Sequence, residues 1–165
     1  MSDGRITHSR KDDVHVLHYF GRVDYTLAPT LQRYLDRLFQ ESRVGGFVFD
    51  LREATLLDST NLGLLARVAE RVRAGCGRRC VLVATTDDIT DVLRSMGFEQ
   101  IFDIVSDDPA VATEPDEEIS VERPSQDELM RTMLEAHRTL VTLNDKDREK
   151  FQDVVMWLES EMHTH

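Results

Sequence analysis

Hydrophobic positions in the first hundred residues alternate between strand-like and helix-like spacing. Short runs of apolar, β-branched or aromatic residues predict strands at 5–9, 14–20, 47–51, 80–84 and 101–105. Apolar residues recurring every three or four positions predict helices at 28–42, 59–74 and 87–95. The resulting order β-β-α-β-α-β-α-β predicts an α/β fold with a mixed, mainly parallel sheet and helices packed on it.

The chain changes character after residue 108. The next sixteen residues combine acidic side chains and prolines with few large apolar residues, which is typical of a linker. The segment Ser125-Gln126-Asp127-Glu128 is a capping box that opens one helix, and Asn144-Asp145 separates it from a second helix. We therefore expect three parts: a domain at 1–108, an acidic, proline-containing linker at 109–124 and a two-helix hairpin at 125–162.

Both C-terminal helices carry an apolar stripe that neither helix can bury alone. In the second helix the stripe consists of Phe151, Val154, Val155, Leu158 and Met162. The stripes predict packing of the helices against each other, against the front domain, against a partner, or against a second copy in a weak dimer.

Charge is divided unevenly along the 165 residues, whose net charge is −11. Residues 1–106 hold 15 acidic and 14 basic residues, a net charge of −1. Residues 107–165 hold 16 acidic and 6 basic residues, a net charge of −10. Because binding to phosphates requires a basic face, we expect neither nucleic acid nor an anionic membrane surface as a partner.

Two further absences bear on the location of the protein. No apolar stretch approaches the roughly 18 residues that a membrane span requires. No apolar segment follows Met1-Ser2-Asp3-Gly4-Arg5, so the start of the chain does not resemble a secretory signal. We therefore expect a cytoplasmic protein.

The sequence contains no common catalytic motif. A Walker A loop, a dinucleotide-binding glycine fingerprint and a Gly-x-Ser-x-Gly elbow are all missing. Cys76 and Cys80 have no further His or Cys pair nearby with which to bind a metal. His137 lies on an apolar helical stripe, where a core or interface role is expected. Three acidic residues recur at strand ends, where such residues usually cap turns: Asp24, Asp50 and Asp58. We expect no enzymatic activity, no metal and no cofactor.

The segment Asp58-Ser59-Thr60-Asn61-Leu62-Gly63 follows a buried strand and opens a helix. Asp58 or Ser59 is expected to cap this helix, with Leu62 and Gly63 packed on the sheet. Free N–H groups and the positive end of the macrodipole make a helix start tolerant of phosphate. A phosphate on Ser59 would add about −1.5 to −2 charges, enough to repel a complementary partner. The residues thus indicate a helix N-terminus and permit a phosphorylation switch.

Four segments resemble motifs of one known family. They are Gly21-Arg22-Val23-Asp24, Phe47-Val48-Phe49-Asp50-Leu51, the Ser59 segment, and Met96-Gly97-Phe98 with Ile101-Phe102. Together they make residues from about 4 to 108 similar to the STAS domain of bacterial anti-sigma factor antagonists. In that family the serine directly after the aspartate is phosphorylated by a kinase that is also the anti-sigma factor. The unphosphorylated form binds this factor and frees the sigma subunit, and a phosphatase resets the switch.

The resemblance implies that Ser59 accepts the phosphate, with Thr60 as a lower-ranked second acceptor. It places Asp24, Asp58, Asn61 and Leu62 at the partner interface near the switch, although the family usually has a small residue at the position of Asn61. The implied partners are an anti-sigma factor, a serine kinase and a phosphatase. The C-terminal helices resemble the extension of a longer subgroup that controls motility and surface growth.

Two other functions stay open on the sequence alone. A scaffold subunit of a stress-signalling complex would assemble through the same STAS domain and would form a stable high-order oligomer. An enzyme or nucleotide-binding protein that uses the acids at strand ends would show hydrolysis or tight nucleotide binding; the missing phosphate-binding loop ranks it last.

Overall fold

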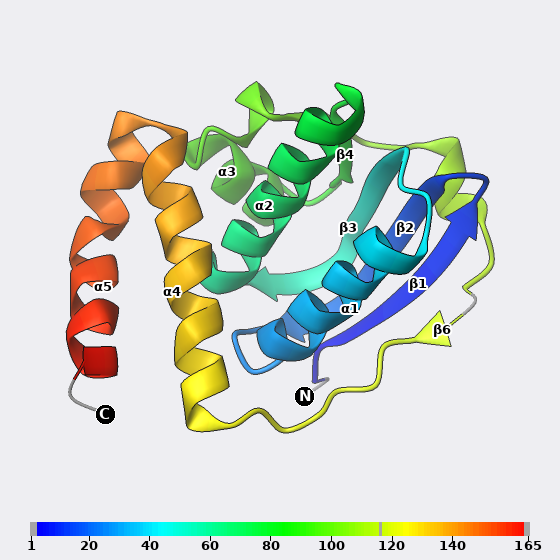
Figure 1. Cartoon of the computed structure of the whole chain (residues 1–165). Helices are drawn as coiled ribbons and strands as arrows, with labels where there is room; N and C mark the ends of the chain where they lie inside the picture. Colours follow the sequence, from blue (N-terminus) through cyan, green and yellow to red (C-terminus); the bar gives the residue numbers. More distant parts are fainter. Residues whose placement is uncertain (1–2, 116, 164–165) are drawn as a thin grey trace.

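A six-stranded sheet forms the centre of the computed structural model, which describes residues 3–115 and 117–163 (Figure 1). Its strands are β1 (Arg5–Lys11), β2 (Val14–Val23), β3 (Gly46–Leu57), β4 (Cys80–Val83), β5 (Phe102–Val105) and β6 (Glu117–Glu118). Their spatial order is β5-β4-β3-β2-β1-β6. Strands β2 to β5 pair in parallel, and β1 pairs antiparallel with β2 and β6. The predicted mixed, mainly parallel α/β fold is confirmed.

The helices follow the predicted order. They are α1 (Ala28–Glu41), α2 (Ser59–Cys76), α3 (Asp87–Ser95), α4 (Gln126–Leu143) and α5 (Asp145–His163), with 3-10 turns η1 (Phe98–Gln100) and η2 (Pro109–Ala112). Helix α2 ends in a left-handed residue, Gly77, whose φ of 73° suits glycine and whose N–H bonds the Arg73 carbonyl. None of the helices in the described part of the chain is long and apolar enough to cross a membrane.

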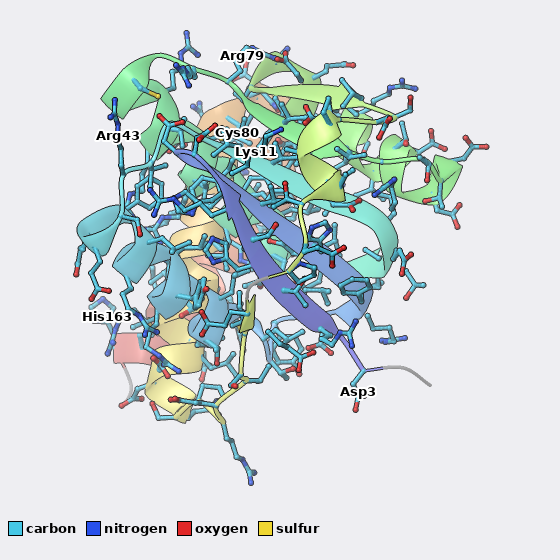
Figure 2. The ribbon with its side chains drawn as sticks, turned by 90° about the vertical axis from the view of Figure 1, so that its right-hand side faces the viewer. Asp3, Lys11, Arg43, Arg79, Cys80 and His163 are labelled. Carbon is cyan, nitrogen blue, oxygen red and sulfur yellow. The ribbon has the colours of Figure 1, made fainter. Side chains whose placement is uncertain are left out.

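The two faces of the sheet carry different apolar clusters. Alternate side chains of β2, among them Leu17 and Tyr19, join the main core beneath the helices. Val16 points the other way and forms a smaller cluster with Val48 and Val83, against which η2 packs. Figure 2, seen toward the β1 edge, shows α1 and η2 on opposite sides of the sheet.

Strand β3 continues six residues beyond its predicted end, to Leu57. Only its first part is a continuous apolar run, and the second part alternates in burial, so the run alone could not reveal its full length. The pairing of β3 with β2 shifts register twice, between His18 and Phe20 and between Gly21 and Arg22. The additional length of β3 places its end two residues before Ser59, the first residue of α2.

The segment predicted as a linker is partly ordered. It holds η2 and the short strand β6, whose residues Glu117 and Glu118 pair with His8 and Thr7 of β1. Ile119 is buried in the main core. The boundaries 1–108, 109–124 and 125–162 remain a prediction.

The C-terminal two-helix extension is present as predicted, and its apolar stripes meet both each other and the front domain. Ser125 caps α4, its Oγ accepting the N–H of Glu128 at 3.1 Å. Helix α4 lies against α2 and α1, while α5 packs on the outer side of α4 (Figure 1). Ala136, Leu140 and Phe151 are part of the main core. The weak dimer through these helices stays a prediction.

Candidate functional site

The backbone turns from β3 into α2 at Asp58. This residue is extended, with φ of −83° and ψ of 173°, and its side chain accepts the backbone N–H of Asn61 at 3.0 Å. It therefore caps α2, and Ser59 becomes the first helical residue. Since Asp58 performs the capping, the hydroxyl of Ser59 is left for another interaction.

Asn61 connects this helix start to the end of β2. Its Nδ2 donates to Oδ1 of Asp58 at 2.9 Å and to the carbonyl of Val23 at 3.2 Å. The side chain is fully buried. An alanine or glycine at this position could make neither bond, so Asn61 adds a side-chain link between the end of β2 and the loop that presents Ser59.

The other predicted site residues lie at different depths. Thr60 and Leu62 are buried, at 2% and 3% exposure, which leaves Ser59 as the half-buried hydroxyl of the pair. Asn61 and Leu62 thus lie beneath Ser59, and their place at a partner interface remains a prediction.

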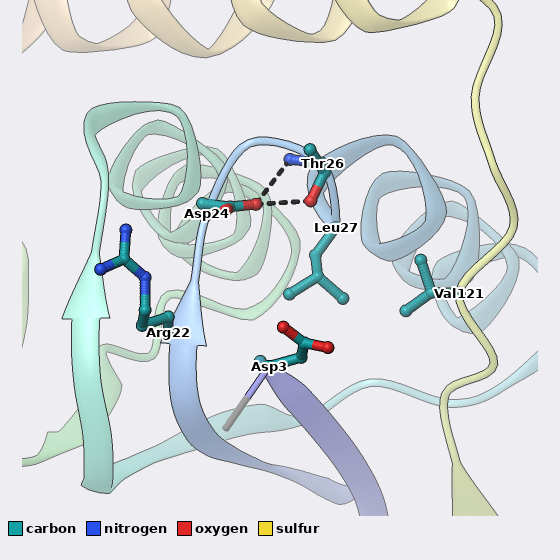
Figure 3. A pocket seen from close by; sticks show the side chains of 7 residues that line it. Asp3, Arg22, Asp24, Thr26, Leu27 and Val121 are labelled. Atoms are coloured by element: carbon teal, nitrogen blue, oxygen red, sulfur yellow. Dashed lines mark hydrogen bonds between the residues drawn. The ribbon is translucent and has the colours of Figure 1, made fainter. Parts of the chain in front are cut away.

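Asp24 lies at the surface, on the loop after β2. Its Oδ1 accepts the backbone N–H of Thr26 at 3.0 Å and the hydroxyl of the same residue. It lines an open cavity of about 540 Å³ that Val121 of the 109–124 segment closes on one side (Figure 3). The other lining residues are Asp3, Gly4, Arg22, Thr26 and Leu27.

Ser59 hydrogen-bonds to a residue of the C-terminal hairpin. Its Oγ lies 2.8 Å from Nε2 of His137 in α4. Nδ1 of the same ring lies 2.6 Å from the carbonyl oxygen of Met133, which can only accept, so Nδ1 carries a hydrogen. In the neutral ring Nε2 is then the acceptor for the Ser59 hydroxyl. Sequence reasoning placed His137 on an apolar stripe but did not connect it to Ser59; its only signal was a polar ring in that stripe.

The three acids at strand ends do not converge. Asp50 binds Arg52 through two bonds of 2.9 Å and His18 Nδ1 at 3.0 Å. Burial alone would raise the pKa of Asp50, but the hydrogen bonds from Arg52 and His18 outweigh it and hold the pKa below its usual range. Asp24 and Asp58 are used in the turns described above. Within the described residues, no group of three or more His, Cys, Asp or Glu side chains is placed to hold a metal ion.

Comparison with known families matches residues 5–112 to the model of the STAS domain, which is more than half of the chain. The chain belongs to the STAS domain family. The family resemblance seen in the sequence is thereby confirmed, and the matched range contains the whole β3–α2 junction around Ser59.

Solved structures similar to this STAS protein include an anti-sigma factor antagonist from Mycobacterium paratuberculosis. It shares 19% identity over 79% of this chain and 94% of its own, with a TM-score of 0.54. The unphosphorylated anti-sigma factor antagonist SpoIIAA has 15% identity and a TM-score of 0.57, covering 64% of this chain and 92% of its own. Phosphorylated SpoIIAA, a Bacillus cell fate determinant, has 14% identity and a TM-score of 0.54, covering 65% and 96%. At these identities the likeness concerns the fold. The comparison with curated proteins gave no match.

Proposed function

We propose that this protein is an anti-sigma factor antagonist whose binding is switched off by phosphorylation of Ser59. The unphosphorylated form binds an anti-sigma factor or kinase partner, and a phosphatase regenerates this form. Sigma-dependent transcription is thus regulated by whether Ser59 is phosphorylated. The observation that carries the proposal is the position of Ser59, the first residue of α2 directly after the capping aspartate. Structurally similar antagonists, one of them solved in both phosphorylated and unphosphorylated forms, support it.

The helix start explains why a phosphate would leave the STAS domain itself folded. The N–H groups of the first turn have no carbonyl acceptor in the preceding turn, and Asp58 occupies only that of Asn61. The remaining N–H groups and the positive end of the helix dipole favour an anion there. Thr60 offers no comparable site, because its side chain is 2% exposed.

The charge of the front domain explains how a phosphate would stop binding. Residues 1–106 are almost neutral, so about −1.5 to −2 charges at Ser59 change the local field strongly. A partner that fits the neutral surface would then meet an uncompensated dianion, and like-charge or unpaired-charge contacts in an interface cost several kcal/mol. The backbone of the STAS domain around Ser59 need not change for this effect.

The modification can be mapped in the native cells. The chain would be purified in the presence of phosphatase inhibitors and digested with trypsin, which cuts after Arg52 and Arg67. The peptide between these sites contains Thr55, Ser59 and Thr60, and fragmentation distinguishes the three hydroxyls. We expect phosphate on Ser59, and none on this peptide in a Ser59→Ala strain. Phosphate confined to Thr55 or Thr60, or its absence under all growth conditions, would contradict the proposal.

A further inference from the structure

The C-terminal hairpin covers the helix that presents Ser59. The closest approach lies at Gly63, where an added Cβ would come within 2.4 Å of the backbone oxygen of Ala136. No side chain fits between the two helices at that point, so glycine permits α4 to lie directly on α2. One turn before Gly63, the same face of α2 carries Ser59.

The histidine that contacts Ser59 is held in place by both helices of the hairpin. Within α4 its Nδ1 is bound to the Met133 carbonyl at 2.6 Å. From α5 the ring of Phe151 packs edge-on against it, with 5.6 Å between ring centroids. His137 is 3% exposed. A ring fixed in this way cannot turn aside from Ser59 while the hairpin stays docked.

This contact occupies the position that a kinase would need. Transfer of a phosphoryl group requires the serine oxygen and the phosphorus about 3–3.5 Å apart and in line. Nε2 of His137 lies 2.8 Å from Ser59 Oγ, so the ring blocks the approach of that group along this line. A protein partner that contacts Ser59 directly would also have to displace His137 and α4.

The ion pairs that join the hairpin to α1 and α2 are partly exposed. Arg67 and Glu135 form an ion pair of 3.0 Å with side chains 31% and 42% exposed. Arg33 and Glu128 are paired at a site of similar exposure. Exposed ion pairs contribute about 0–1 kcal/mol each, so release of the hairpin is opposed mainly by its buried apolar residues, Ala136, Leu140 and Phe151 among them.

We propose that the α4–α5 hairpin is an autoinhibitory cap on Ser59. When it is docked, His137 withholds the serine from both the kinase and the binding partner; when it is released, Ser59 becomes available to both. The proposal rests on the proposed function of Ser59, but the covering of Ser59 can be tested by itself.

A cysteine at the switch position measures that covering without any partner. The test uses the full chain with Ser59→Cys in a Cys76→Ser background, because Cys76 is exposed and would react. Cys80 is buried, and burial raises the pKa of its thiol to about 12, so it stays silent. The rate of alkylation by iodoacetamide then reports the exposure of position 59.

Substitutions at two glycines of α2 provide the comparison. Gly63→Val introduces a side chain against the Ala136 backbone and should undock the hairpin, whereas a Cβ at Gly75 meets nothing within 4 Å. We expect Gly63→Val to accelerate alkylation at least about tenfold, since labelling follows the population of the open form, and Gly75→Ala to leave it unchanged. Hydrogen exchange of α4, α5 and the sheet peptides checks that only the hairpin has been released.

A second variant covers the case in which Gly63→Val unfolds the chain. His137→Ala removes the ring that covers position 59 and leaves Gly63 unchanged where α2 and α4 cross. Alkylation of the cysteine at position 59 should therefore again accelerate. Equal alkylation rates in the parent and in a folded, undocked variant would overturn the cap, as would fast alkylation in the parent itself. Either result would leave the phosphorylation of Ser59 untouched, because the assay contains neither kinase nor partner.

Discussion

The hydroxyl of Ser59 and Nε2 of His137 lie 2.8 Å apart although 78 residues separate them in the chain. One residue begins the second helix of the STAS domain and the other lies in the middle of the C-terminal hairpin. The STAS domain and the extension that follows it are therefore joined at Ser59, the residue proposed to be phosphorylated.

A double-mutant cycle should detect this bond. Ser59→Ala, His137→Ala and the double variant would be unfolded with urea, and their free energies of unfolding compared. We expect a coupling of about 0.5–1.5 kcal/mol, the usual net contribution of a hydrogen bond. The pair Ser95→Ala and His137→Ala is the control, because exposed Ser95 lies on α3 and bonds only the Val92 carbonyl. Additive effects of the Ser59 and His137 substitutions would show that the two side chains do not interact in solution.

Asn61 should be important for stability, because its buried amide joins β2 to the start of α2. Asn61→Ala removes the hydrogen bonds of the amide to the Val23 carbonyl and to Asp58, and we expect a loss of about 1–3 kcal/mol in the free energy of unfolding. Gln126→Ala, at an exposed position, should change it by less than about 0.5 kcal/mol. A similarly small effect of Asn61→Ala would mean that the amide is not what fixes this loop.

Stability should fall below neutral pH because of His15. Burial lowers the pKa of this ring. Its Nδ1 lies 2.9 Å from Nε2 of His8, and its Nε2 lies 3.1 Å from the Arg43 carbonyl oxygen. A His whose pKa is lower in the folded state binds more protons when unfolded, so stability rises with pH up to about 6.5 and is flat above it. The urea midpoint should therefore decrease from about pH 7 to pH 5. A His15→Gln variant should show a smaller decrease, and an unchanged slope would contradict this assignment.

How far the sequence predicts the structure depends on whether the signal is local. The run at Phe47–Leu51, the cap at Asp58 and the capping box at Ser125 are short-range patterns, and each produced the element expected from it. Strand β6 escaped prediction because it consists of two glutamates that pair with the β1 edge and form side-chain contacts with Arg5 and Tyr34, residues distant in the sequence. Acidic, proline-containing sequence carries no sign of such pairing.

The candidate site was predictable only in part. The position of Ser59 at a helix start follows from the residues around it. The burial of Asn61 and Leu62 depends on β2 and on the helices above, and the contact of His137 depends on how a hairpin 66 residues further along folds back. Such contacts between distant segments arise from tertiary packing, which no local spacing encodes.

The proposed switch is tested most directly by comparing the proteins that bind to variants with and without a negative charge at residue 59. Wild type, Ser59→Ala and Ser59→Asp would be immobilised in equal amounts and exposed to lysate of the native cells, with bound proteins quantified by mass spectrometry. Ser95→Asp adds the same charge at a distant exposed position and is the control. We predict at least one protein that wild type, Ser59→Ala and Ser95→Asp capture and Ser59→Asp does not. Equal capture by Ser59→Ala and Ser59→Asp would contradict the account.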